Sequence, residues 1–230
     1  MDINAVITGD LVKSRRIHEG DMDTVINSLK STFGDINKYL LGNNGKFEIF
    51  RGDSFQGLVP QPELALLVSI IIRAKLRTFE PSFSSAGKRN PKKPILHAYS
   101  DARISVGIGK ISYNGKTIAE SQGEAFERSG HALDRMKTGN ERLAVITPWE
   151  QVNKELEVEC QLADVIISRW TSTTADAMYH YLLFEKTQQE LATQFKITQP
   201  AARKRLVVYG NVNSINAFIN RYKELINNPK

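Results

Sequence analysis

Two aspartates, each directly after a glycine, are the residues of this 230-residue sequence best suited to metal chemistry. Asp10 follows Gly9 in AVITGDLVKSR, and Asp53 follows Gly52 in FRGDSFQGLV. Carboxylate oxygens are the ligands that Mg²⁺ and Mn²⁺ prefer in proteins, and a glycine leaves room for a phosphate chain to approach the backbone. If the fold brings the two aspartates together, the sequence predicts a site for a divalent metal and a nucleotide.

Asp53 also has two simpler interpretations. Aspartate is a common turn residue, so it can merely shape the tip of the hairpin that Gly52 allows between KFEIF and SFQGLV. The tripeptide at residues 51–53 matches an adhesion motif, but adhesion requires a secreted protein, and we find no export signal at the start of the sequence. A purely structural role for Asp10 and Asp53 therefore stays the alternative to a metal site.

A second group of candidate residues lies in TQQELATQFKITQPAARKRL, residues 187–206, which has the layout of two short helices joined by a turn. Thr187 and Glu190 have the spacing of a capping box at the start of the first helix, and Thr198 can cap the second. Lys196 occupies the turn position where glycine is usual, because that position requires a left-handed backbone. The apolar residues expected to be buried between the helices are Leu191, Phe195, Ile197, Ala202 and Leu206.

The exposed side of the second helix is expected to bind double-stranded DNA through Thr198, Gln199, Arg203 and Lys204. In the major groove, Arg and Lys favour guanine, and Gln favours adenine. From Arg169 to the end of the sequence there are nine Lys or Arg against four Asp or Glu, which indicates an anionic partner. The alternative is a helical bundle that dimerises or docks on the rest of the protein.

Hydrophobic periodicity predicts the elements that must position these residues. Strands are expected at residues 2–10, 46–50, 54–59, 102–109 and 141–147, and helices at residues 21–41, 62–79 and 123–136. The resulting order, β-α-β-β-α-β-α-β, is typical of an α+β fold of the ferredoxin-like or palm type. In such a sheet the first strand is central and lies beside the hairpin, so Asp10 and Asp53 should converge at one edge.

The strand pattern stops at residues 147–148, and everything beyond is helical. We therefore predict a palm domain at residues 1–148, a connecting helix at 149–170 and an all-α helix-turn-helix domain at 171–230. The basic stretch GKRNPKKP at residues 87–94 falls in an expected loop, where it is either a contact for an anion or ordinary solvated surface. A single cysteine, no membrane-length apolar stretch and no export signal predict a cytoplasmic protein.

The N-terminal part resembles the class III nucleotide cyclases. ITGDLVKS is similar to their first strand, FRGDSFQG to their metal-binding hairpin and RISVGIGKI to their next core strand, an arrangement shared with GGDEF-like diguanylate cyclases and palm polymerases. Most of the chain resembles the SatD family, which has the same ITGDLV and RGDSFQ stretches. The resemblance implies that Asp10, Asp53 and the carbonyl of Leu11 bind Mg²⁺ or Mn²⁺ with a nucleoside triphosphate.

The helix after the third of these stretches departs from the cyclase pattern. Aligned on Gly123, Glu127 and His131 stand where cyclases carry an Asn and an Arg that steadies the transition state. A carboxylate there repels a triphosphate, and histidine is mostly neutral at pH 7. Arg128, Lys13 or Arg15 could compensate by binding phosphate together with the backbone at Gly9 and Gly52. We expect nucleotide binding with little or no turnover.

These features together predict a DNA-binding transcriptional regulator whose cyclase-like domain senses a nucleotide and a divalent metal. The C-terminal helices resemble the helix-turn-helix units of bacterial repressors and sigma factors. We expect a homodimer, because cyclase-type sites form between two protomers and helix-turn-helix units usually bind paired half-sites. The alternatives are a metal-dependent nucleotidyltransferase or nucleotide cyclase with a regulatory C-terminal domain, and a metal-free scaffold whose helices bind another protein.

Overall fold

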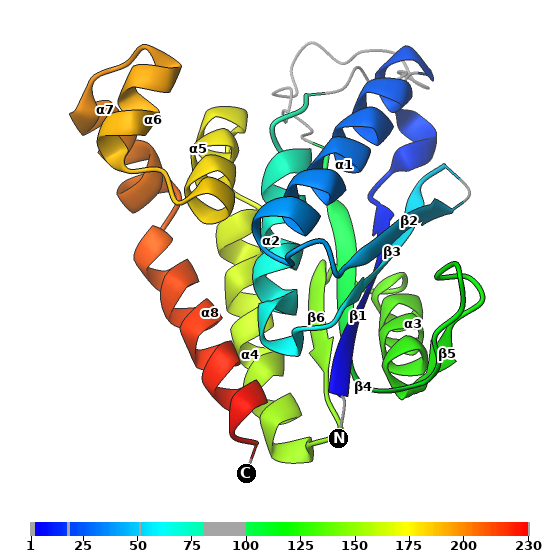
Figure 1. The fold of residues 1–230 in the computed structure, drawn as a ribbon. Helices are drawn as coiled ribbons and strands as arrows, with labels where there is room; N and C mark the ends of the chain where they lie inside the picture. The colour runs from blue at the N-terminus through cyan, green and yellow to red at the C-terminus, as the bar shows by residue number, and fades with distance from the viewer. Residues whose placement is uncertain (1–2, 18, 51, 81–99, 230) are drawn as a thin grey trace.

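The computed structural model describes residues 3–17, 19–50, 52–80 and 100–229 (Figure 1). A mixed sheet lies at the centre, with helices on both faces and the C-terminal helices along one side. Its strands are β1 (Ile3–Leu11), β2 (Lys46–Phe50), β3 (Ser54–Val59), β4 (Ala102–Tyr113), β5 (Gln122–Gly123) and β6 (Leu143–Ile146). The basic stretch at residues 87–94 lies outside the described residues.

Eight α-helices are present in the described part of the chain. Three of them precede residue 148 and five follow it, in agreement with the three helices predicted in the N-terminal part and the all-helical C-terminal part. They are α1 (Glu19–Tyr39), α2 (Ala65–Leu76), α3 (Glu124–Met136), α4 (Glu150–Ile167), α5 (Ser172–Phe184), α6 (Gln188–Phe195), α7 (Gln199–Arg203) and α8 (Val212–Asn227). Two short 3₁₀ turns, η1 (Ser14–Arg16) and η2 (Pro62–Leu64), and a π-helical segment, η3 (Lys204–Tyr209), complete the set. Within the described ranges, no helix is long and apolar enough to cross a membrane.

The predicted order of strands and helices is confirmed. The sheet runs β2-β3-β1-β4, and β4 additionally pairs with β6, in parallel, and with the two-residue β5, which the sequence had not predicted. β1 is therefore central and antiparallel to both β3 and β4, the connectivity of a βαββαβ unit. Gly52 has φ of 79° at the tip of the β2–β3 hairpin, the left-handed conformation that glycine adopts without strain.

The two faces of the sheet pack differently. Ala5, Ile7 and Leu11 of β1 belong to the main core beneath α1 and α2, whereas Val6 packs with Ala125 of α3 on the opposite face. The main core continues without interruption through α4 and α5 to α8. The predicted change to all-helical structure near residue 148 is confirmed, while separate folding of the two parts stays a prediction.

A buried cluster of charged residues joins the sheet to the C-terminal helices. Asp101, directly before β4, accepts hydrogen bonds from Arg73 (3.0 and 3.1 Å) and Arg77 (3.1 Å) of α2 and from Arg142 (2.8 Å), directly before β6. Arg73 also pairs with Asp164 of α4, and the backbone N–H of Arg142 donates to the same carboxylate. Because Arg73 and Asp101 are almost completely buried, the cluster fixes four distant segments to one another.

Candidate functional site

The structure brings the backbones of Asp10 and Asp53 to one end of the sheet, as predicted. Asp10 lies in register with Ser54 of β3, and the N–H of Leu11 donates to the carbonyl of Asp53 at 2.9 Å. The end of β1 and the tip of the hairpin are thus hydrogen-bonded neighbours. The glycine turn at residue 52 lets β3 return beside β2, and the pairing of β3 with β1 then places the hairpin tip next to the end of β1.

The carboxylate of Asp10 is held by an arginine that the sequence had not singled out. Arg103 is the register partner of Asp10 on β4, and its Nε and Nη2 donate to the two carboxylate oxygens at 2.8 and 3.0 Å. Asp10 is nearly buried, and the Arg103 side chain is 23% exposed. A bidentate pair of this kind is charge-assisted and fixed in geometry. The sequence contains no local signal for it, because it depends on the pairing of two distant strands.

Asp53 is half-buried and is held from the loop that follows β1. Ser14 Oγ of η1 donates to Asp53 Oδ2 at 2.7 Å, which fixes this loop against the hairpin tip. The preceding residue, Lys13, has φ of 59°, a left-handed conformation that is uncommon for a residue with a side chain. Lys13 and Arg15 are exposed on the loop, so two cations accompany the two aspartates.

The two glycines beside the aspartates differ in their surroundings. A Cβ atom on Gly9 would lie 2.4 Å from the ring of Phe55, so this position is filled by packing. A Cβ atom on Gly52 would meet no heavy atom within 4 Å. Open space next to the aspartates is therefore found at the hairpin tip, and the ring of Phe55 occupies the space that was expected to admit a phosphate at Gly9.

The remaining predicted nucleotide-binding residue, Arg128 on α3, lies elsewhere. Its Nη1 donates to the carbonyl of Ile108 on β4 and to the carboxylate of Glu124 on α3. Ile108 is five residues from Arg103, which is about 17 Å along the strand. The structure therefore does not bring Arg128 to Asp10. Glu127 and His131 are exposed on α3.

The residues at the end of β1 are of the types that bind a divalent metal, but Arg103 already occupies the carboxylate of Asp10. Two carboxylates and the nearby Leu11 supply the hard oxygen ligands that Mg²⁺ prefers. Both oxygens of Asp10 already accept hydrogen bonds from Arg103, so a metal at Asp10 has to displace that arginine. In the described part of the chain, no three or more His, Cys, Asp or Glu residues are grouped closely enough to hold a metal ion.

The second candidate site, at α6 and α7, has the local structure that the sequence predicts. Thr187 and Glu190 form a complete capping box, with Thr187 N donating to Glu190 Oε2 at 2.8 Å. Thr198 caps α7 by accepting a hydrogen bond from the backbone of Ala201. Lys196 is left-handed, with φ of 53°, which confirms the conformation expected at the turn.

The predicted buried and exposed residues of α6 and α7 are mostly confirmed. Leu191, Ala202 and Leu206 are buried, whereas Phe195 and Ile197 are only half-buried. The exposed residues include Thr198, Gln199, Arg203 and Lys204. The sequence did not predict that α7 ends at Arg203 and continues as the π-helical segment η3.

Gln199 is held in place by the preceding helix. Its Nε2 donates to Oε1 of Gln188, the first residue of α6, at 2.6 Å. Farther along, the Nζ of Lys204 lies 5.4 Å from the ring centre of Tyr209, an exposed residue of η3. Polar and cationic side chains are thus exposed from the start of α7 to the start of η3, at the end of the molecule that the α6–α7 pair occupies (Figure 1).

Comparison with known proteins gives little further information. No family model and no curated protein matches the sequence. Among solved structures, the chain is similar to a bacterial light-regulated adenylyl cyclase at 14% identity and a TM-score of 0.41, covering 62% of this chain and 74% of that chain. This similarity is too distant to assign a function, and membership of the SatD family stays a prediction.

Proposed function

We propose that this protein is a DNA-binding regulator and that α7 enters the major groove of double-stranded DNA. The observation that carries the proposal is a capped helix that follows a tight left-handed turn and exposes Gln199 at its start and Arg203 and Lys204 at its junction with η3. In helix-turn-helix proteins the N-terminal residues of the second helix contact base edges. The resemblance of residues 187–206 to bacterial helix-turn-helix units supports the same function.

The hydrogen bond between Gln188 and Gln199 supports a role for Gln199 in contacting a base. A glutamine amide can donate and accept simultaneously at an adenine edge. The hydrogen bond from Gln199 to Gln188 restricts the Gln199 amide before any DNA arrives, which lowers the entropy that binding must overcome. α7 contains five residues, about 7.5 Å of helix. Gln199 lies in its first turn, and Arg203 and Lys204 lie about one turn farther on, at the junction with η3.

Replacing Arg203 or Lys204 by alanine tests this function. If either residue contacts a base, each substitution should weaken specific binding by about 1 to 3 kcal/mol and relax the preference at one position of the DNA site. Binding should fall steeply with salt, because each neutralised phosphate releases counterions. The measurement is fluorescence anisotropy with labelled upstream genomic fragments at two salt concentrations.

Lys30→Ala is the matched control, because it removes one exposed lysine from α1, far along the chain from α7. Its affinity for DNA should equal that of the wild type. Absence of binding by the wild type at low salt, or unchanged binding by Arg203→Ala and Lys204→Ala, would contradict the DNA-binding proposal and favour a helical bundle that binds protein.

A second function, binding of a nucleotide with Mg²⁺ or Mn²⁺ at the end of β1, is favoured by the convergence of Asp10 and Asp53. The carboxylates of Asp10 and Asp53 would hold the metal, and the metal would neutralise part of the charge of the nucleotide phosphates. Arg103, released from Asp10, would then be available to a phosphate, as would Lys13 and Arg15 on the adjoining loop. Turnover as a cyclase or nucleotidyltransferase remains the alternative activity of this same end of the sheet.

A thermal-shift measurement with Mn²⁺ and each ribonucleoside triphosphate tests the second function. A ligand at about 100 times its dissociation constant should stabilise the protein by about 2.7 kcal/mol, and Asp53→Asn should remove that response while keeping the shape of the side chain. Asp23→Asn, which changes an exposed carboxylate on α1, is the control and should respond like the wild type. An undiminished shift in Asp53→Asn would exclude this metal site.

A further inference from the structure

The end of β1 is hydrogen-bonded to the buried charge cluster as well as to the hairpin tip. The N–H of Leu11 donates to the carbonyl of Asp53, and the N–H of Val12 donates to the carbonyl of Asp101 at 2.8 Å. The last residues of β1 therefore lie between the hairpin tip and Asp101. A ligand that draws the carboxylates of Asp10 and Asp53 toward itself would displace a segment whose next residue is bonded to Asp101.

Arg77 connects Asp101 to the segment that follows α4. Its Nη1 donates to Oδ2 of Asp101 at 3.1 Å. Its Nε and Nη2 donate to the carbonyl of Trp170 at 3.3 and 2.8 Å, and Nη2 also donates to the carbonyl of Ser168 at 2.7 Å. These carbonyls follow the last turn of α4, where intrahelical donors are missing. Because Arg77 and Trp170 are buried, losing these hydrogen bonds would be costly.

Trp170 connects the same segment to the end of η3. Its indole N–H donates to the carbonyl of Gly210 at 3.2 Å. Gly210 is tightly packed, since a Cβ atom there would lie 2.7 Å from the sulfur of Met178 on α5. The N–H of Gly210 donates to the carbonyl of Arg205 at 2.8 Å, five residues back, which is the spacing of a π-helical bond. A displacement of Trp170 therefore reaches the end of η3, which continues directly from α7.

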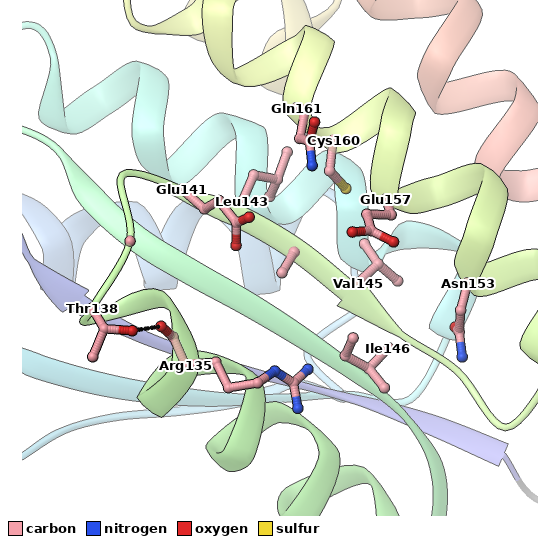
Figure 2. Close-up of a pocket in the computed structure, with 12 residues that line it drawn as sticks. Arg135, Thr138, Glu141, Leu143, Val145, Ile146, Asn153, Glu157, Cys160 and Gln161 are labelled. Atoms are coloured by element: carbon pink, nitrogen blue, oxygen red, sulfur yellow. Dashed lines mark hydrogen bonds between the residues drawn. The ribbon is translucent and has the colours of Figure 1, made fainter.

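The body of α4 is fixed to the sheet and cannot absorb such a displacement. Asn153 and Cys160 of α4 line the groove between this helix and β6 (Figure 2). The side-chain amide of Asn153 accepts from the N–H of Thr147 at 2.8 Å and donates to its carbonyl at 3.0 Å. Near the other end of the helix, Asp164 accepts from the N–H of Arg142 at 2.6 Å. The short segment after α4 is therefore the part that can shift.

We propose that the buried path Asp101–Arg77–Trp170–Gly210 couples the two candidate sites, so that a metal and nucleotide at the end of β1 change the affinity of α7 for DNA. The inference rests on the proposed function, because both sites must bind their ligands. Coupling of this kind is reciprocal, so DNA must change the affinity for the nucleotide by the same factor.

Arg103 gives the end of β1 two arrangements between which a ligand can select. In one, which the structure shows, Arg103 holds both carboxylate oxygens of Asp10. In the other, a bound metal takes this carboxylate and Arg103 is released. A ligand that binds only the second arrangement shifts the population toward it. The bond from Val12 to Asp101 is the first step by which that change leaves the site.

DNA affinity measured with and without nucleotide tests the proposal. Fluorescence anisotropy with a labelled upstream genomic fragment is recorded for the protein alone and with Mg²⁺ and saturating ATP, GTP, CTP or UTP in turn. In the wild type, at least one nucleotide should change the dissociation constant for DNA about fivefold or more. In Trp170→Phe, which keeps most of the packing and lacks the indole donor, this ratio should be close to one. Comparing ratios within each variant removes any effect of the substitution on DNA binding alone.

Tyr222→Phe is the matched control. Tyr222 is completely buried, and its hydroxyl donates to the carbonyl of Pro62 at 2.6 Å, outside the buried path. This variant also loses one hydrogen bond from a buried aromatic ring to a backbone carbonyl. Its ratio of DNA affinities should equal that of the wild type.

The indole N–H signals in a ¹⁵N spectrum give a second measurement, because the chain has two tryptophans. Mg²⁺ with the nucleotide should shift the signal of Trp170 and leave that of Trp149, at the opposite end of α4, in place. An unchanged Trp170 signal, or a ratio in Trp170→Phe equal to that of the wild type, would overturn the buried path. If both ligands bind but neither changes the affinity for the other, the coupling is wrong and the proposed function stands. If DNA or every nucleotide fails to bind, the proposed function and the coupling fail together.

Discussion

Replacing Asp101 by alanine is expected to destabilise the protein by about 3 to 5 kcal/mol, the cost of removing one partner from a buried ion pair. Three arginines donate to this carboxylate, and Arg73 and Arg77 are buried with it. Without Asp101, Arg73 would keep only its contact with Asp164. The positive charges left in the interior would then repel one another. Urea unfolding followed by circular dichroism measures the loss.

Asp134→Ala is the control for this experiment, because Asp134 forms an exposed ion pair with Lys137 and such pairs contribute about 0 to 1 kcal/mol. Asp101→Asn should be intermediate, since the amide oxygen can still accept the hydrogen bond from the backbone of Ala102. A loss for Asp101→Ala no larger than that for Asp134→Ala would show that the cluster is not a source of stability.

The same cluster predicts how stability depends on pH. Burial alone raises the pKa of Asp101, but the neighbouring arginines outweigh burial and lower the pKa to about 2. In the unfolded chain an aspartate titrates near 3.9. The stabilisation from Asp101 is therefore present above about pH 4 and is lost as the pH falls toward 2. The Asp101→Ala variant should lack this part of the acid transition.

Replacing Trp170 by alanine should cost about 3 to 5 kcal/mol, because a large side chain would leave a cavity between α4 and α5. Trp170 is completely buried, and its indole N–H donates to the carbonyl of Gly210, at the end of η3, at 3.2 Å. Trp170→Phe keeps most of the apolar contact and loses the donor, so it should fall between the wild type and Trp170→Ala.

Thermal or urea unfolding measures both variants, and Tyr113→Ala is the control, because Tyr113 is 59% exposed. Trp170→Ala should also weaken any binding that requires α7, since the ring connects the start of α5 with the segment that follows α7. A variant as stable as Tyr113→Ala would mean that the neighbouring residues close around the missing ring.

The features that could be predicted from sequence are those encoded by neighbouring residues. The alternation of apolar and polar residues predicted the strands of the sheet, and helical periodicity predicted the helices that pack on it. The spacing of Thr187 and Glu190 predicted the capping box. The left-handed turn at Lys196 was expected from its place between two capped helices. Each of these depends on interactions within about four residues along the chain.

The features that could not be predicted depend on the register of distant strands and on tertiary packing. Nothing near Arg103 in the sequence indicates that it faces Asp10, because the two are joined only by the β1–β4 pairing. In the sequence, Arg73 is one of several basic residues that follow an apolar stretch, and nothing distinguishes it from its neighbours. In the structure it is completely buried. The phosphate space expected at Gly9 is filled by Phe55, a neighbour that only the folded sheet supplies.

The buried charge cluster also constrains the order of events while the chain is being synthesised. Arg73 emerges from the ribosome 91 residues before Asp164 (164 minus 73), an interval of roughly 5 to 20 seconds at ordinary rates of translation. During that time the apolar helix α2 carries an arginine whose carboxylate partners are incomplete. Arg73 therefore reaches its final, paired burial only after α4 has been made.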